Sequence, residues 1–199
     1  MVAAMPILPS EPAINPEDLL AGLTTDATAQ HADDPAKWWV LHTKPRQEKA
    51  LARQLMELGL AYYLPLFPKR HRIRGRLMTA YVPLFDGYVF LWGSIVERQK
   101  AFQTNRVVQA INVKDQDRLT QDLKQVKRLI DTGRPIMPVN ALEPGDEVEI
   151  RVGPLTGLRG TIIGSSRGQR FMVKVDFIQR GAAIEIEDVD LIPIHAKDD

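Results

Sequence analysis

A change of hydrophobic period near residue 134 is the feature that most constrains this fold. Before that point, segments with apolar residues at every second position alternate with segments whose apolar residues recur three or four positions apart. After it, only short alternating segments with glycine-bearing turns remain, and Pro135, Pro138 and Pro144 stand between the two blocks. We therefore predict a mixed α and β domain followed by a linker and a small all-β domain.

The first block opens with a strand and a helix. Residues 38–43 are rich in aromatic and β-branched residues, which is typical of a strand. Leu51, Leu55 and Leu58 then recur at helical spacing, and Gly59 is placed to end the helix.

A basic hairpin is predicted next, from two extended arms that join near Gly75. The apolar residues 62–66 lead into it, and the stretch 69–76 carries most of its positive charge. An apolar run at 84–92 follows, and it is long enough to form a central strand of a sheet.

The remainder of this block predicts two helices with a strand between them. Ser94 is a good N-cap for a helix that runs to about Thr104, and residues 107–113 form the next strand. The last helix begins near Asp115 or Asp117 and ends at Gly133; its apolar stripe is Leu119, Leu123, Val126 and Ile130. The order β-α-β-β-α-β-α, with helices on one side of a mostly antiparallel sheet, predicts an α+β sandwich.

The second block predicts a small β-barrel. Its four alternating segments lie at 148–152, 160–163, 171–175 and 183–186, each separated from the next by a glycine-bearing turn. About 55 residues with this spacing can bury their strand edges by closing the sheet on itself.

These patterns predict the domain boundaries. Residues 1–36 hold five prolines and no aromatic residue, so we expect a disordered acidic tail, with a short helix within Pro16–Leu23 as an alternative for that part. The α+β domain covers 37–133, the linker 134–143 and the barrel 144–195.

The net charge of +1 hides a strong partition along the chain. Residues 1–36 carry a net charge of −6, residues 37–133 carry +10 and residues 134–199 carry −3. A basic domain between two acidic segments indicates nucleic acid or another polyanion near that domain. The alternative is an ordinary solvated surface with clustered charges.

Several classes of protein are excluded or disfavoured. The absence of cysteine excludes disulfides, thiolate zinc sites and cysteine nucleophiles, and the four histidines share no metal-ligand spacing. We find no glycine-rich phosphate loop or nucleophile elbow, so we expect no catalytic residue, cofactor or metal. No membrane-length apolar run or basic leader is present, which favours a cytoplasmic location and no membrane partner.

The second block resembles the KOW motif. Gly145 and Asp146 turn the chain into the first strand, and Gly153 with Pro154 makes a tight turn. Gly157 and Gly160 permit backbone geometry that a side chain would obstruct. The alternative is an unrelated SH3-like barrel with similar turns.

The first block resembles the N-terminal (NGN) domain of the NusG family of transcription elongation factors. The resemblance is carried by the Trp38-Trp39-Val40-Leu41 strand, the helix after it, the basic hairpin and the Leu84-to-Phe90 segment. The spacing from Trp38 to Leu91 is similar to the RfaH-like branch, whereas the KOW block is more similar to NusG itself. This sequence departs from the family in having Asp86 where proline is common, and in its acidic leader.

The resemblance implies a surface that binds the β′ clamp helices of RNA polymerase. The matching positions are His42, Tyr88 and Phe90, with Leu84 and Phe85 beside them. Alternation places residues 88 and 90 on one face of their strand, and we expect that face to point outward. The alternative is that Tyr88 and Phe90 fill the core.

The resemblance also implies contact with the non-template DNA strand near the transcription bubble. Cations there can follow phosphates without reading bases, and the alternative for each one is ordinary solvated surface. The candidate residues are Lys44, Arg46, Lys49, Arg53, Gln54, Arg72, Arg74, Arg76 and Arg106.

The KOW block is expected to bind a separate partner. By resemblance this is either the termination factor Rho or a small-subunit ribosomal protein, held by Phe177, Ile178 and Arg180. The alternative is that Phe177 and Ile178 pack within the barrel. We see no helical period in this block that would support refolding into helices.

The resulting prediction is a monomeric, non-enzymatic factor that modulates pausing, termination or antitermination. A KOW protein that only binds ribosomal RNA is the competing reading. It would need a basic second block, yet residues 134–199 sum to −3. The direction of regulation and the target operon stay open.

Overall fold

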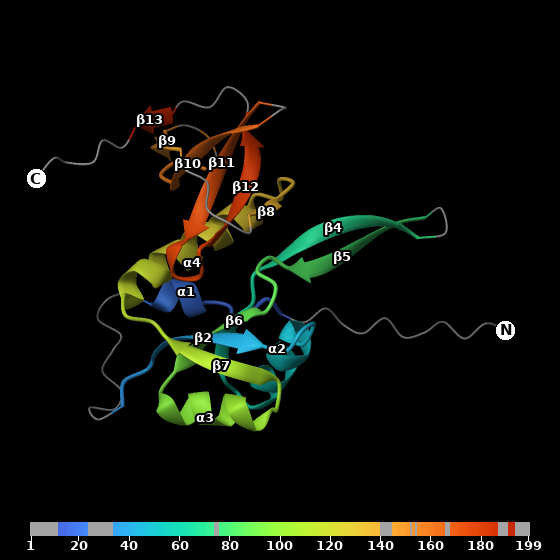
Figure 1. Cartoon of the computed structure of the whole chain (residues 1–199), viewed down its shortest axis with the longest axis vertical. Coiled ribbons are helices and arrows are strands. Elements are labelled where there is room, and N and C mark those ends of the chain that lie inside the picture. The colour runs from blue at the N-terminus through green and yellow to red at the C-terminus, as the bar shows by residue number, and fades with distance from the viewer. Residues whose placement is uncertain are drawn as a thin grey trace, which may run out of the picture.

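The computed structural model contains two β-sheets, a separate two-stranded hairpin and four α-helices in its described residues (Figure 1). All strand pairs are antiparallel. None of the described helices is long and apolar enough to cross a membrane. The structure describes residues 12–23, 34–73, 76–139, 145–151, 153, 155–165, 168–186 and 191–193.

The five-stranded sheet is the centre of the N-terminal unit, which comprises β1 to β7 and α1 to α4. Its strands, in sheet order, are β1 (Ile14–Asn15), β3 (Ala61–Tyr63), β6 (Tyr88–Gly93), β2 (Lys37–Thr43) and β7 (Val107–Asn112). The predicted central strand is confirmed, because β6 lies in the middle and its apolar residues are buried on both faces.

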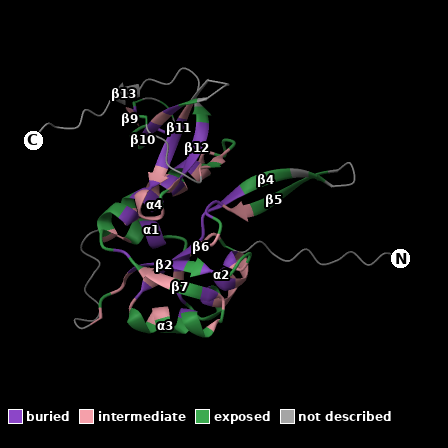
Figure 2. Cartoon of the chain, viewed as in Figure 1, coloured by how far each residue is buried: buried purple, intermediate pink, exposed green. Residues whose placement is uncertain are grey.

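Helices cover both faces of this sheet, so the prediction that they lie on one side is wrong. Helices α2 (Glu48–Glu57) and α3 (Ile95–Gln103) cover the face that carries Trp39 and Leu91, which we call the α2–α3 face. Helices α1 (Leu19–Gly22) and α4 (Gln116–Asp131) pack against the opposite face, the α4 face. The buried residues of both faces are visible in Figure 2. Because the strands carry apolar side chains on both faces of the sheet, both faces need to be covered, and two helices pack on each.

The predicted helix ends are confirmed by local hydrogen bonds. The Ser94 hydroxyl accepts from the Val96 N–H at 3.1 Å, and the Glu97 carboxylate accepts from the Ser94 N–H at 2.8 Å. These bonds form a capping box, and the Ser94 contact lowers the pKa of Glu97. The Asp115 carboxylate caps α4 by accepting from the Arg118 N–H at 2.9 Å.

The basic hairpin forms as predicted but stands apart from both sheets. Strands β4 (Leu66–Ile73) and β5 (Arg76–Pro83) pair only with each other among the described residues, and they project from the body of the molecule (Figure 1). The apolar arm before the hairpin is a distinct strand, β3, that joins the five-stranded sheet instead. The observed order therefore has more strands between α2 and α3 than we predicted.

The C-terminal unit is a six-stranded sheet. Its order is β13 (Leu191–Pro193), β9 (Asp146–Ile150), β10 (Arg159–Ser165), β11 (Gly168–Val175), β12 (Arg180–Ile186) and β8 (Met137–Val139), with the 3₁₀ turn η1 (Asp176–Ile178) before β12. The four predicted strands are present, but the described strands do not close into a barrel. Strand β8 lies inside the predicted linker and pairs with β12. Gly160 is required by packing, because a Cβ there would lie 2.4 Å from the Met172 carbonyl oxygen.

Part of the predicted N-terminal tail is ordered, which corrects our expectation of disorder for residues 12–23. The Tyr62 hydroxyl donates to the Pro12 carbonyl at 3.0 Å, and the Leu64 N–H donates to the Ala13 carbonyl at 2.6 Å. Helix α1 is the short helix expected as an alternative, and its Leu19 and Leu20 are buried. The segment has too few apolar residues to fold alone, but the α4 face gives these two leucines a place to pack.

The two units share one hydrophobic core. Buried residues of the α4 face, of α4 and of the C-terminal strands form a continuous cluster. Polar contacts at its margin include a bond of 2.8 Å from the Arg159 N–H to the Gln125 side chain and one of 2.6 Å from Arg128 to the Thr156 carbonyl. Helix α4 therefore packs against both the five-stranded sheet and the C-terminal unit.

Candidate functional site

A groove of about 840 Å³ lies where the hairpin leaves the N-terminal unit. Its walls come from the end of β2, the start of α2, the base of the hairpin and the loop before β6. It brings together residues from both predicted sets, the polymerase-binding and the nucleic-acid-binding. The lining residues include His42, Arg46, Lys49, Phe67, Lys69, Val82, Leu84 and Pro138.

A tight turn at Gly87 fixes one wall of the groove. Gly87 has a φ of +83°, which disfavours any residue with a side chain. Its N–H donates to the buried Glu48 carboxylate at 2.7 Å, and its carbonyl accepts from the Thr43 N–H at 2.8 Å. Asp86, which replaces the proline common in the family, is exposed at this turn. Contacts from α2 and β2 therefore hold a turn that the family commonly builds with proline.

An aromatic pair lies where β2 ends and β6 begins. The His42 and Tyr88 rings are 5.4 Å apart at a tilt of 37°; His42 is exposed and Tyr88 is half-buried. These two side chains are the accessible members of the predicted polymerase-binding set.

The other members of that set belong to the core. Leu84, Phe85 and Phe90 have exposed fractions of 2%, 1% and 0%. Phe85 and Phe90 pack edge to face, with ring centroids 6.2 Å apart. Residues 88 and 90 do share a face, as alternation predicted, but our expectation that both point outward is wrong for Phe90, because the α4 face is covered.

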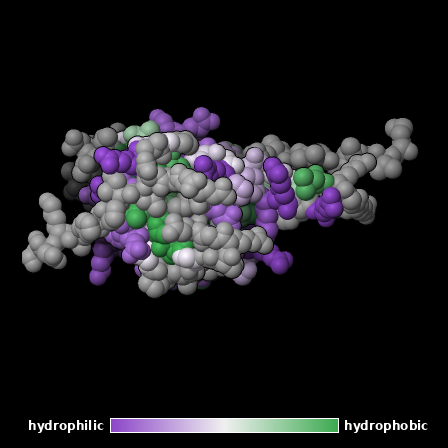
Figure 3. All heavy atoms as spheres, turned by 90° about the horizontal axis from the view of Figure 1, so that it is seen from above, coloured by the Kyte–Doolittle hydropathy of each residue, from purple (hydrophilic) through white to green (hydrophobic). Residues whose placement is uncertain are grey.

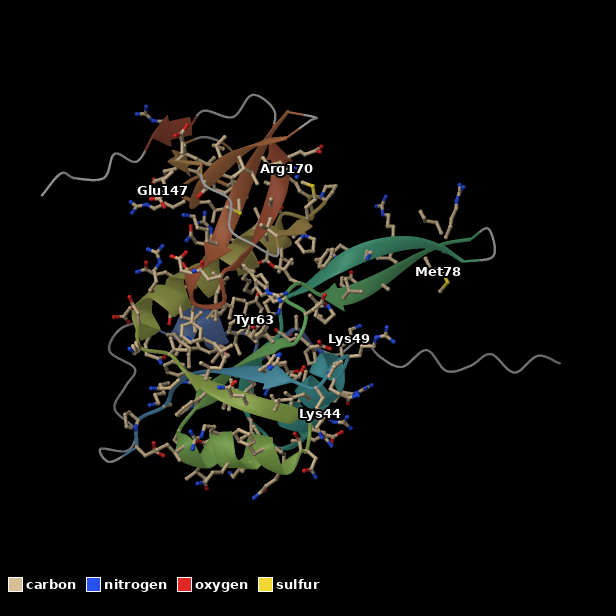
Figure 4. All side chains as sticks on the ribbon, viewed as in Figure 1. Lys44, Lys49, Tyr63, Met78, Glu147 and Arg170 are labelled. Carbon is tan, nitrogen blue, oxygen red and sulfur yellow. The ribbon has the colours of Figure 1, made fainter. Side chains whose placement is uncertain are left out.

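The residues predicted to bind a KOW partner cover this same face. The Arg180 guanidinium lies 5.3 Å from the centre of the Tyr88 ring, and Phe177 and Ile178 pack against the shared core. All three are half-buried. Figure 4 shows Tyr63, another buried aromatic of this core, between the five-stranded sheet and the C-terminal unit; burial raises the pKa of its phenol far above the usual range. Two surfaces that we predicted for separate partners therefore contact each other.

An ionic network fixes η1 against α4 beside this contact. Arg118 pairs with Asp176 at 2.7 Å and with Asp122 at 3.4 Å, and the Asp122 carboxylate accepts from the Asp176 N–H at 3.1 Å. Burial raises the pKa of Asp122 to about 6, against the lowering effects of that N–H and of Arg118. The network ties the position of η1 to the charge of one buried carboxyl.

The predicted nucleic-acid residues fall into three groups. Lys44 and Arg46 are exposed, and Arg46 lines the groove together with Lys49 at the start of α2. Figure 4 labels Lys44 and Lys49 on this part of the molecule. Arg106 donates from Nε to the Gln54 side chain at 2.8 Å, and its guanidinium also donates to the Gln47 side chain. Arg106 and Gln54, two predicted nucleic-acid residues, are therefore hydrogen-bonded to each other. Arg53, a third, precedes Gln54 on α2. The third group is on the hairpin: Arg72 is exposed, Arg76 begins β5 and Arg74 lies outside the described residues.

Some site residues were missed by our sequence reasoning. Phe67 and Val82 line the groove beside Lys69 of the predicted basic hairpin, and alternation within the hairpin would have placed all three on one face. Pro138 gave no local signal, because it reaches the groove from a segment that we predicted to be a linker. The described residues contain no cluster of three or more metal-ligating side chains.

These features define an interaction module, built from a basic α+β domain and an antiparallel β-domain packed on its aromatic face. The NusG family model, described as transcription termination factor nusG, matches residues 36–141. Because the match spans more than half of the chain, the protein belongs to the NusG family, whose members are non-enzymatic transcription factors.

Solved structures include distant similarities. A structure described as domain interaction in Thermotoga maritima NusG is 18% identical, covering 75% of this chain and 93% of that one with a TM-score of 0.44. Conformation A of the MjSpt4:Spt5 complex is 17% identical, covering 79% of this chain and 99% of that one with a TM-score of 0.27. No curated protein sequence matches this chain.

Proposed function

We propose that this protein is a transcription elongation factor that binds RNA polymerase and modulates pausing, termination or antitermination. Family membership supports a role in transcription. We assign the polymerase contact to the His42–Tyr88 pair, with Leu84, Phe85 and Phe90 as the apolar base beneath it. The β′ clamp helices are the partner that the resemblance implies.

One observation carries this assignment: the His42–Tyr88 pair is accessible at the edge of a buried aromatic cluster. Aromatic side chains bury much area and lose little rotamer entropy, so they suit the centre of an interface. A partner helix that replaces Arg180 over the Tyr88 ring would gain access to the apolar residues behind it. Polymerase binding therefore requires the C-terminal unit to move away from this face.

The contact between Arg180 and Tyr88 would couple binding of the KOW partner to binding of RNA polymerase. Phe177, Ile178 and Arg180 are the residues proposed to hold Rho or a small-subunit ribosomal protein, and they pack on the N-terminal unit. Release of the C-terminal unit would expose both surfaces together. We propose that residues 144–195 form a KOW domain with an SH3-like barrel, that 37–133 form the NGN domain, and that 134–143 connect them through β8.

The groove residues Arg46 and Lys49, with Lys44 next to them, are proposed to follow the non-template DNA strand. Lys44 and Arg46 are exposed, and Lys69 extends the cationic wall toward the hairpin. Cations that contact phosphates hold a nucleic-acid strand without selecting its sequence. We further propose that this protein is a specialised, RfaH-like member of the family. The support is that the spacing of residues from Trp38 to Leu91 is similar to the RfaH-like branch without a gap.

The test compares capture of RNA polymerase by the full chain and by a His42→Ala plus Tyr88→Ala variant. We expect the variant to lose at least about tenfold in affinity, because two interface aromatics are removed. Met56→Ala is the matched control: Met56 is 40% exposed on α2, which covers the opposite face of the sheet. Unchanged capture by a folded double variant would refute the proposed surface.

A further inference from the structure

The β4–β5 hairpin carries apolar side chains that nothing in the described chain covers. Leu77 is 64% exposed, and Met78 and Tyr81 are each 51% exposed. Figure 3 shows apolar residues beside hydrophilic ones on this projecting arm. Exposed apolar side chains grouped on a projecting hairpin are candidates for contact with a ligand.

The strand register sorts these side chains onto two faces. Tyr81 pairs with Pro68, Thr79 with Arg70 and Leu77 with Arg72; we call this the Tyr81 face. The other face, the Met78 face, carries Met78 and the pairs of Val82 with Phe67 and Ala80 with Lys69, and its base lines the groove. Of the Tyr81 face only Pro83, at its base, lines the groove, so the part from Tyr81 to the tip is a separate surface.

The Tyr81 face combines an exposed ring with two exposed cations. Arg70 is the diagonal neighbour of Tyr81, within reach of a long side chain in an antiparallel pair, and Arg72 lies one step further toward the tip. Residues 66–83 contain no Asp or Glu. A ligand for this face must therefore be a polyanion that also offers flat apolar groups.

We propose that the Tyr81 face binds an unpaired DNA strand, with one base stacked on the Tyr81 ring and phosphates paired with Arg70 and Arg72. This inference rests on the proposed function, which brings the hairpin to the DNA of a transcription complex. Base stacking on an aromatic ring combined with cations along the backbone is how proteins hold single strands. Paired DNA keeps its bases stacked on each other and would leave the Tyr81 ring unused.

The test is the affinity of the full chain for a fluorescent single-stranded DNA of about 20 nucleotides, measured by anisotropy at several salt concentrations. Tyr81→Ala should weaken binding by about tenfold without changing the salt dependence, and Tyr81→Phe should restore it because the ring stacks without the hydroxyl. Arg70→Ala plus Arg72→Ala should lower the salt slope by about 1.4, the value for two phosphate contacts on a single strand.

Met78→Ala is the matched control, since Met78 has the same exposure as Tyr81 on the same strand but lies on the other face. Equal losses for Met78→Ala and Tyr81→Ala, or no loss for Tyr81→Ala, would overturn the proposal. So would tighter binding of a duplex or an RNA of the same sequence.

Capture of RNA polymerase separates this proposal from the proposed function. Tyr81→Ala should capture polymerase as the wild type does, because Tyr81 is not part of the His42–Tyr88 surface. Loss of capture together with unchanged DNA binding would make the Tyr81 face a protein contact and refute the inference. If the wild type fails to capture polymerase, the proposed function fails, and the DNA affinities still decide the role of Tyr81.

Discussion

The two faces of the five-stranded sheet are equally well buried, but they are covered by very different parts of the chain. The α2–α3 face, with Trp39, Leu41 and Leu91, is covered by helices that follow strands β2 and β6 within a few residues. The α4 face, with Trp38 and Phe90, is covered by segments from both ends of the chain, including α1 and the C-terminal unit.

From this difference we propose that the α2–α3 face is a permanent core and that the C-terminal unit can leave the α4 face. Short connections place α2 and α3 on the sheet at little entropic cost. The C-terminal unit packs on the α4 face from a distant part of the sequence, and its contact there includes polar residues such as Arg118, Asp176 and Arg180. Interfaces of this kind between domains of one chain separate more readily than a single core does.

The largest effect is expected for Phe90→Ala, which tests whether the α4 face is a core in the free protein. Phe90 has no exposed surface, so its truncation should lower the free energy of unfolding by about 3–5 kcal/mol in a urea titration. Leu91→Ala, on the opposite face, should cost a similar amount, about 2–5 kcal/mol. A cost below about 1 kcal/mol for Phe90→Ala alone would mean that the α4 face is open in solution.

A smaller effect is expected for Leu20→Ala, which tests the contribution of the N-terminal segment. Leu20 is buried on the short helix α1, and the loss should be about 2 kcal/mol, at the low end for buried leucine because a terminal segment can separate on its own. Loss of stability without any change in polymerase capture is expected. If the variant is as stable as the wild type, residues 12–23 do not pack on the α4 face in solution.

Ser94→Ala tests how much the N-cap of α3 contributes to the stability of the α2–α3 face. Removal of the N-cap hydroxyl of α3 should cost about 1 kcal/mol in the same titration. Because α3 packs on the opposite face from the C-terminal unit, polymerase binding should not change. A change in polymerase affinity would show that the two faces are coupled.

The last prediction is a pH dependence of stability from Asp122. Burial raises its pKa from 3.8 to about 6, so the folded protein binds this proton more tightly than the unfolded chain does. The stabilising contribution is therefore complete below about pH 4 and is lost as the pH rises through about 6. Relative to Asp122→Asn, the wild type should lose stability between these values. A difference that is constant from pH 4 to 7, or that grows in the opposite direction, would contradict the buried position of this carboxyl.

Sequence alone predicted the features that depend on neighbouring residues. The strand alternation, the caps at Ser94 and Asp115 and the turn at Gly59 are local, and all are confirmed. Sequence could not place Phe90 correctly, because an apolar residue on a strand gives no sign of which distant segment will cover it. The packing of residues 12–23 and the contact of Arg180 with Tyr88 were missed for the same reason.

The most direct measurement is hydrogen exchange of the full chain, free and with saturating RNA polymerase. The account predicts faster exchange in the peptide that contains Asp176–Arg180, because the C-terminal unit leaves Tyr88 when polymerase binds. Peptides from α2 and α3 should stay unchanged. Unchanged exchange at Asp176–Arg180 together with new protection on α2 and α3 would contradict it, because polymerase would then bind the opposite face.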